Sequence, residues 1–122
     1  MSTFRNLKVY QLCRQLNKEI FTLLKESNCD RTIRDQLSRA SMSIALNIAE
    51  GAGRFSSKDK KHFYIIARAS AAECMAILDI MEDLDILSPL QAARFRERYE
   101  ELSKMMFGMI RALEAPAQGL AS

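Results

Sequence analysis

Most of the side chains whose types and spacing suggest chemistry lie in one stretch, Ser43 to Phe63, which reads SIALNIAEGAGRFSSKDKKHF. Asn47 and Glu50 stand three residues apart, so on a helix they share one face. An amide beside a carboxylate would suit the polar site of an enzyme. The same pair would also suit a structural network that ties this segment to the next helix. We favour a structural polar network, with these members: Arg39, Asn47, Glu50, Arg68 and Glu73.

The sequence Gly51-Ala52-Gly53-Arg54 raises the question of a phosphate-binding loop. Such a loop follows a β-strand, and a P-loop also needs a Gly-Lys-Ser or Gly-Lys-Thr sequence. Here helical periodicity precedes the glycines, and no such triplet follows them. We therefore interpret the segment as the corner between two helices. Gly51 is expected to occupy a left-handed C-cap position, and Gly53 to relax the turn.

The other reactive residue types do not form a recognisable site. Cys13, Cys29 and Cys74 are an odd set without CxxC spacing, and His62 is the one histidine. This pattern supports neither a zinc site nor a disulfide framework, and it favours reduced thiols. No Gly-x-Ser-x-Gly sequence is present, and no glutamate stands three residues before His62. We expect no catalytic residue, no metal and no cofactor.

Apolar residues recur with helical spacing along the chain and divide it into four segments. The first helix is predicted from about Arg5 to Lys25, with an unusually wide apolar face. The second begins after Asp30, whose side chain is suited to an N-cap, and its apolar seam ends at Ile48. The third is capped by either Ser56 or Ser57.

The start of the fourth helix is the best marked of the four. Ser88 is an expected N-cap, Pro89 occupies the first helical position, and Gln91 completes a capping box. Leu87 and Ala92 are placed to form the flanking hydrophobic staple. Short corners between long helices make sequential neighbours antiparallel.

The sequence therefore predicts an all-α fold, an antiparallel up-down-up-down four-helix bundle. A chain of 122 residues with 48% hydrophobic residues can bury one core. We expect one domain over residues 1–114 and a flexible C-terminal tail over residues 115–122. No apolar run has the length of a membrane span or of a secretion signal, so a cytoplasmic location is expected.

Charge is unevenly distributed along the chain and, by this topology, along the bundle. Residues 1–72 hold thirteen Lys and Arg against six Asp and Glu, whereas residues 73–122 hold five against nine. The start of the first helix, the corner after the second and the end of the fourth share one end of the bundle. That end collects the candidate nucleic-acid-binding residues: Arg5, Lys8, Arg54, Lys58, Lys60 and Lys61. Such a patch suits contacts with phosphate groups, although it also suits a solvated charged surface.

Three segments of the sequence resemble a known family. FRNLKVYQ, SIALNIAEGAGR and FYIIARASAAE are similar to the small bacterial four-helix-bundle proteins encoded by intervening sequences within large-subunit ribosomal RNA genes. That family also resembles the accessory variability protein of diversity-generating retroelements. The chain departs from the family pattern at Tyr10, where Trp is commoner, and at Ala69, where Gly is usual. The resemblance implies a ring-like homopentamer, a nucleic-acid partner and no enzymatic activity.

Three functions remain open on the sequence. We favour a non-enzymatic oligomer that binds structured RNA or duplex DNA. The alternatives are a protein–protein adaptor, and an enzyme with a site at Asn47 and Glu50. No membrane partner and no small-molecule substrate is indicated. The hairpin of the second and third helices is expected to bring Arg39 to Glu73, or Glu50 to Lys60 or Lys61, within salt-bridge reach.

Overall fold

The protein is almost entirely helical. A computed structural model describes the backbone of residues 3–121 and the side chains of residues 3–114. A short 3-10 helix, η1 (Phe4–Asn6), precedes four α-helices: α1 (Lys8–Glu26), α2 (Arg31–Ala52), α3 (Ser57–Asp83) and α4 (Pro89–Ala121). The described residues contain no strand. The predicted all-α class is therefore confirmed.

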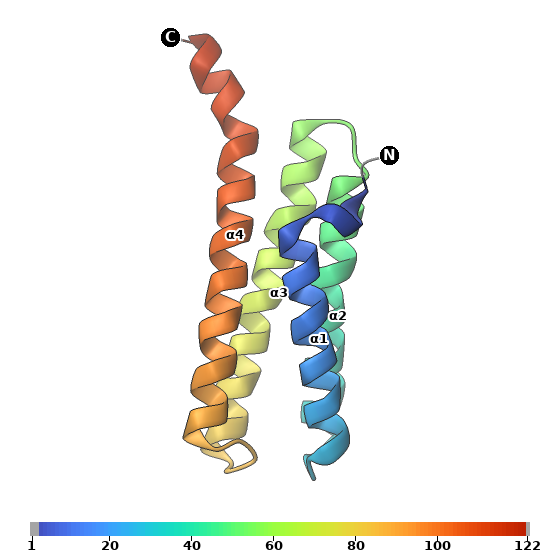
Figure 1. The fold of residues 1–122 in the computed structure, drawn as a ribbon, viewed down its shortest axis with the longest axis vertical. Helices are drawn as coiled ribbons and strands as arrows, with labels where there is room; N and C mark the ends of the chain where they lie inside the picture. Colours follow the sequence, from blue (N-terminus) through green and yellow to red (C-terminus); the bar gives the residue numbers. More distant parts are fainter. Residues whose placement is uncertain (1–2, 122) are drawn as a thin grey trace.

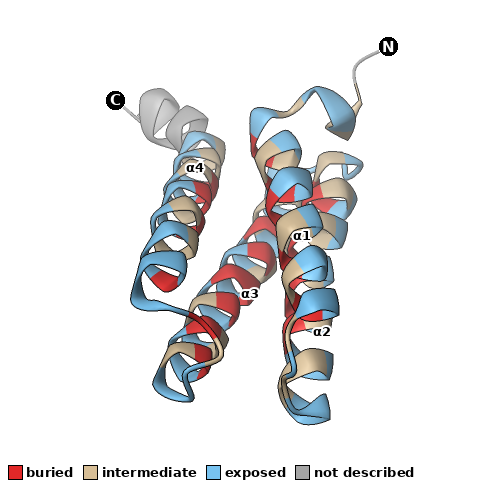
Figure 2. Cartoon of the chain, turned by 60° about the horizontal axis from the view of Figure 1, so that its bottom comes forward, coloured by how far each residue is buried: buried red, intermediate tan, exposed pale blue. Residues whose placement is uncertain are grey.

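The four helices run alternately up and down, so the predicted bundle topology is confirmed (Figure 1). Each helix packs against two others: α2 and α4 flank α3 on either side, and α1 lies against α2 and α4. The α2–α3 corner, the start of α1 and the C-terminal part of α4 all lie at the upper end of Figure 1. The helices turn their buried residues toward one another and their exposed residues outward (Figure 2).

The predicted caps hold three of the helix starts. The Asp30 carboxylate accepts a hydrogen bond from the Thr32 amide at 2.8 Å. Ser56, rather than Ser57, caps α3, since its hydroxyl accepts from the Asp59 amide at 3.0 Å. Each such cap satisfies one backbone N–H that has no partner within the helix.

The capping box at the start of α4 is formed in both directions. The Gln91 amide donates to the Ser88 hydroxyl at 3.1 Å, and the Gln91 side chain accepts from the Ser88 amide at 3.0 Å. Leu87 and Ala92, the predicted staple, are both buried. The sequence therefore located this helix start correctly.

The first and last helices differ from their predicted bounds. The chain is extended at Leu7, with φ −72° and ψ 128°, so η1 and α1 are separate where one helix from Arg5 was predicted. Thr3 caps η1 by accepting from the Arg5 amide. At the other end, α4 extends to Ala121. The flexibility predicted for residues 115–122 stays a prediction, because their side chains lie outside the described residues.

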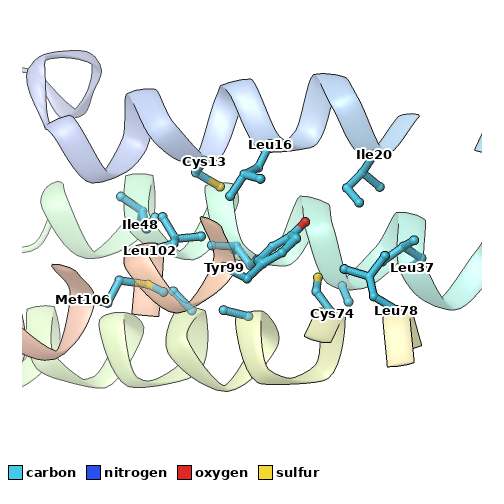
Figure 3. Packing of buried hydrophobic residues seen from close by; sticks show 14 of the residues in the cluster. Cys13, Leu16, Ile20, Leu37, Ile48, Cys74, Leu78, Tyr99, Leu102 and Met106 are labelled. Carbon is cyan, nitrogen blue, oxygen red and sulfur yellow. The ribbon is translucent and has the colours of Figure 1, made fainter. Parts of the chain in front are cut away.

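One continuous core fills the bundle. It combines residues of all four helices, among them Leu16, Leu37, Cys74 and Tyr99, each fully buried. Tyr99 of α4 is the largest of these, and its ring points across the core toward α1 (Figure 3). This packing fixes the positions of the helix ends, where the candidate site lies.

Candidate nucleic-acid interface

The structure gathers the predicted cations at one end of the bundle. Arg5 belongs to η1, which contacts both α1 and α2, and Lys8 opens α1. Arg54 lies in the α2–α3 corner, and three lysines occupy the first turns of α3. Figure 1 shows these segments together at the upper end. We call the following set the cationic end: Arg5, Lys8, Arg54, Lys58, Lys60 and Lys61.

The α2–α3 corner is short and is held by backbone hydrogen bonds. It consists of residues 53–56, between the end of α2 and the start of α3. The Gly53 amide donates to the carbonyls of Ala49 and Glu50, both at 3.2 Å, and the Arg54 amide donates to Gly51 at 3.2 Å. The segment is thus a helix–helix corner, as predicted, and not a phosphate loop after a strand.

The role predicted for Gly51 is wrong. Gly51 lies inside α2, Gly53 is the C-cap with φ −85°, and no described glycine has a positive φ. Gly51 is instead a point of close approach. A Cβ at this position would lie 2.6 Å from a ring carbon of Tyr64 and 3.2 Å from the Cβ of Phe63. The missing side chain lets α3 approach α2 next to the corner.

Three members of the cationic end are engaged within the protein. Lys60 donates from Nζ to the Ala52 carbonyl at 3.0 Å, and so helps to satisfy the free carbonyls at the end of α2. Arg54 pairs with Glu50 at 2.8 Å. Lys61 pairs with Glu114 of α4 at 3.0 Å. These interactions brace the corner and lower the charge available to an external anion.

Arg54 has a second contact that orients it. Its guanidinium lies 4.7 Å from the centroid of the Phe63 ring, in a cation–π arrangement. The side chain is therefore held between a carboxylate and an aromatic face, directly before Phe55 in the corner.

The other three cations have no carboxylate partner among the described residues. Arg5, Lys8 and Lys58 are all exposed, and Arg5 packs over the Phe4 ring at 4.9 Å. Asp59 is the nearest acidic residue in sequence to Lys58 and lies in the first turn of α3. Three cations from η1, α1 and α3 are thus available to meet phosphates.

Among the described side chains, no hydrogen bond or ion pair joins two members of the predicted polar network. Asn47 donates to the backbone carbonyl and hydroxyl of Ser43, at 2.8 and 3.1 Å. The Ser43 hydroxyl also bonds that of Ser70 on α3 at 2.9 Å. Arg68, on the side of α3 that faces α4, donates to Ser103 and lies over the Phe107 ring. The polar link between α2 and α3 is therefore a short Asn47–Ser43–Ser70 chain.

Neither predicted hairpin salt bridge forms among the described side chains. Glu50 pairs with Arg54 on its own side of the corner, and no ion pair joins Arg39 to Glu73. Lys60 reaches backbone carbonyls instead of the Glu50 carboxylate. The sequence placed the helices correctly but not the directions of these long side chains.

Two interactions that link α1 to other helices were not predicted from the sequence. Arg34 of α2 donates to the carbonyls of Leu24 and Ser27, at the end of α1. Arg98 of α4 pairs with Glu19 of α1. Long-range ion pairs have no short-range sequence signal, since the partners here stand far apart in the chain.

Two of the three cysteines, Cys13 and Cys74, are buried in the core, whereas Cys29 is partly buried. Burial raises the pKa of the Cys13 and Cys74 thiols to about 12, so both stay protonated near neutral pH. Among the described residues, no cluster of His, Cys, Asp or Glu is placed to hold a metal ion. None of the described helices contains an apolar stretch long enough to cross a membrane.

Fold and site together define an antiparallel four-helix-bundle protein with a set of exposed cations at the α2–α3 end. The chain matches the family model described as the 23S rRNA-intervening sequence protein over residues 5–108, and it belongs to that family. The resemblance seen in the sequence is thereby confirmed. The family description names no reaction.

A solved structure has the same fold. It is the crystal structure of a protein of unknown function from the S23 ribosomal protein family of Bacteroides thetaiotaomicron, with a TM-score of 0.80 and 21% sequence identity. The alignment covers 84% of this chain and 97% of that chain. No curated protein matches the chain.

Proposed function

We propose that this protein is a non-enzymatic oligomer that binds structured RNA or duplex DNA through its cationic end. The observation that carries the proposal is the placement of Arg5, Lys8 and Lys58 at one end of the bundle, exposed and without a carboxylate partner among the described side chains. Cations of this kind release counterions when they meet phosphates, which favours binding to a polyanion. The neighbouring cations Arg54, Lys60 and Lys61 are bonded within the protein and stabilise this end of the bundle.

The helix dipole supports the same proposal. Lys58 stands in the first turn of α3, where the helix already carries partial positive charge and an acidic side chain would be more favourable. A lysine there costs a little helix stability in the free protein. An external phosphate would remove that cost by contacting the ammonium group and the helix end together.

Self-association would multiply a modest charge. A cyclic arrangement of parallel protomers would place several cationic ends on one rim, and the resemblance implies five protomers. Affinity for a polyanion rises steeply with the number of phosphate contacts. The oligomer is therefore part of the proposed function.

The test is a charge-removal variant chosen from the cations that no described carboxylate engages. Lys60 and Lys61 are left intact, because replacing them would also remove interactions with α2 and α4. Replacing Arg5, Lys8 and Lys58 with Gln is expected to weaken binding to an RNA hairpin and to a DNA duplex. The slope of log affinity against log salt should fall by about 0.7 to 0.9 for each phosphate that the variant no longer neutralises.

A matched variant carries three replacements at the opposite end of the bundle. Lys25, Arg31 and Arg94 are exposed there, and their replacement with Gln removes the same total charge. An equal reduction in affinity for both variants would mean nonspecific attraction rather than a site. If the unmodified protein binds neither RNA nor DNA at about 50 mM salt, the proposal fails and the adaptor function takes its place.

A further inference from the structure

Phe55 is the most exposed large apolar side chain of the described residues. Its relative exposure is 103%, so the ring stands clear of the rest of the protein. The other aromatic rings near this end are occupied. Phe4 packs edge-on against Tyr10, and Phe63 carries the Arg54 guanidinium. An aromatic ring that stands entirely in water gains free energy when a partner covers its apolar surface.

The backbone around Phe55 is held even though the side chain is free. On one side, the Arg54 amide bonds Gly51, and the Arg54 side chain lies between Glu50 and Phe63. On the other side, Ser56 caps α3. The ring is therefore presented from a fixed point, which reduces the entropy cost when a flat partner stacks on it.

The charge around Phe55 indicates which partner fits. Arg54 precedes it, Lys58 follows one helical turn later, and both are exposed. The tip thus offers one flat apolar surface flanked by cations. An unpaired nucleobase has the complementary form, a flat ring joined on both sides to phosphates.

We propose that Phe55 stacks on an unpaired base of a bound RNA or DNA strand, one base for each protomer. This inference rests on the proposed nucleic-acid binding and refines it. Bases inside a duplex have both faces covered by their neighbours, whereas bases in loops, bulges and single strands expose a face for stacking. The cationic end would then prefer strands with unpaired positions over uniform duplex.

A membrane surface fits these observations less well. Binding at a bilayer interface needs a broad apolar face on a helix. Here one ring stands among Gly53, Arg54, Ser56 and Ser57. Insertion of one ring per protomer would bury little apolar area.

The test uses the full chain, which contains no tryptophan. Phe55→Trp places one fluorescent reporter at the tip, and Phe21→Trp places one on α1 away from the cationic end. The probes are a single-stranded RNA, the DNA strand of the same sequence, its duplex, and an abasic strand of equal length. We expect both single strands, but neither the duplex nor the abasic strand, to quench the fluorescence of the Phe55→Trp protein. The fluorescence of Phe21→Trp should respond to none of them.

Affinity supplies the second readout. Phe55→Leu keeps an apolar side chain but removes the aromatic face, and it is expected to weaken single-strand binding roughly 5- to 150-fold. Binding to duplex and abasic strands should not change. Circular dichroism should show an unchanged fold, since the Phe55 side chain is fully exposed.

The outcomes separate this inference from the proposed function. Unchanged single-strand affinity in Phe55→Leu, or equal quenching of Phe55→Trp by the abasic strand, overturns base stacking while leaving phosphate binding intact. Absence of all nucleic-acid binding by the unmodified protein overturns both base stacking and the proposed function.

Two further outcomes would assign the ring to another partner. If the Phe55→Trp fluorescence responds to vesicles of phosphatidylserine and phosphatidylcholine but not to nucleic-acid strands, the ring belongs to a membrane contact and base stacking is overturned. A lower oligomer mass in Phe55→Leu likewise overturns it and assigns the ring to a contact between protomers.

Discussion

At the scale of single residues, the core of the bundle contains two thiols and one phenol whose side chains pack against apolar neighbours. Cys13, Cys74 and Tyr99 are fully buried, and burial raises the pKa of all three side chains. Each therefore stays uncharged over the physiological pH range. The Tyr99 hydroxyl lies beside the Cys74 thiol but has no hydrogen-bond partner with ordinary geometry in the described structure. Its ring contributes apolar area, while its hydroxyl carries a desolvation cost.

Tyr99→Phe is expected to leave the protein as stable as before, or to stabilise it by about 1 kcal/mol. The change removes an unsatisfied buried hydroxyl and keeps the ring that fills the core. Chemical denaturation of both proteins measures the difference in the free energy of unfolding.

Tyr64→Phe is a suitable control, because Tyr64 is also buried but its hydroxyl is not among the unpartnered groups. A destabilisation above about 1 kcal/mol for Tyr99→Phe would contradict the structure. It would mean that the hydroxyl makes a hydrogen bond, for instance to the neighbouring Cys74 thiol or to a buried water.

At the scale of elements, short-range signals were predictable from the sequence and close approaches were not. The capping box at Ser88 depends on residues three apart, and it formed as predicted. Gly51 looked like a C-cap because glycine is common there. Its actual role depends on Tyr64, whose position relative to Gly51 is set by how α3 packs on α2.

A left-handed residue lies at the other corner of the bundle. Asp85 has φ 59° and follows the end of α3. The Ile86 amide donates to Met81, and the Asp85 amide donates to Glu82, which is the hydrogen-bond pattern of a Schellman motif. Aspartate is among the few non-glycine residues that tolerate a left-handed conformation. Because aspartate is also common at many other positions, Asp85 alone did not predict the Schellman motif.

The candidate site was predictable in its location but not in its internal contacts. Helix order alone brings Arg5, Arg54 and Lys58 to one end, since antiparallel helices alternate their ends. Which cations are paired depends on side-chain directions. Lys60 turns back to the Ala52 carbonyl, and Lys61 reaches Glu114 of α4. These interactions required the packed structure.

Gly51→Ala is expected to destabilise the protein by about 1 to 3 kcal/mol. The added methyl group would lie 2.6 Å from the Tyr64 ring, so α2 and α3 would have to separate next to the corner. Thermal unfolding followed by circular dichroism measures the change in stability.

Gly108→Ala is the matched control within α4. A Cβ at Gly108 meets nothing within 4 Å, so the substitution should stabilise the helix by about 0.5 to 1 kcal/mol. If Gly51→Ala gave a similar gain, the close approach of Tyr64 to Gly51 would be refuted.

At the scale of the whole molecule, most of the large apolar side chains that are exposed among the described residues lie outside α1. The wide apolar face of α1 is mostly covered, and Phe21 is its one large exposed apolar side chain among the described residues. Met42 and Leu46 are exposed one turn apart on α2. On α3 the exposed apolar residues are Ile65, Ala69, Ala72, Ala76 and Ile80, and the first three of them line a groove together with Ser103 and Ile110 of α4.

The exposed side of α3 has the composition of a contact between helices. Its alanines on α3 allow close helix approach, and its larger residues supply apolar area to bury. Ala69, Ala72, Ala76 and Ile80 recur at three- and four-residue spacing along one side of α3. A second copy of the chain is the occupant that we propose, in line with the oligomer implied by the resemblance.

We expect the unmodified protein to be a cyclic homo-oligomer by light scattering, and Met42→Glu with Leu46→Glu to dissociate it. Two carboxylates buried against another protomer would each lose hydration without gaining a partner. Both side chains are about half exposed in the protomer, at 49% and 62%, so the fold itself should tolerate the change.

The control is Leu84→Glu with Leu90→Glu, which adds the same charge at the α3–α4 corner, the end of the bundle opposite the cationic end. This variant should leave the oligomer intact. A monomer for the unmodified protein at high concentration would contradict the assembly, and dissociation by the corner variant alone would move the interface to the α3–α4 end.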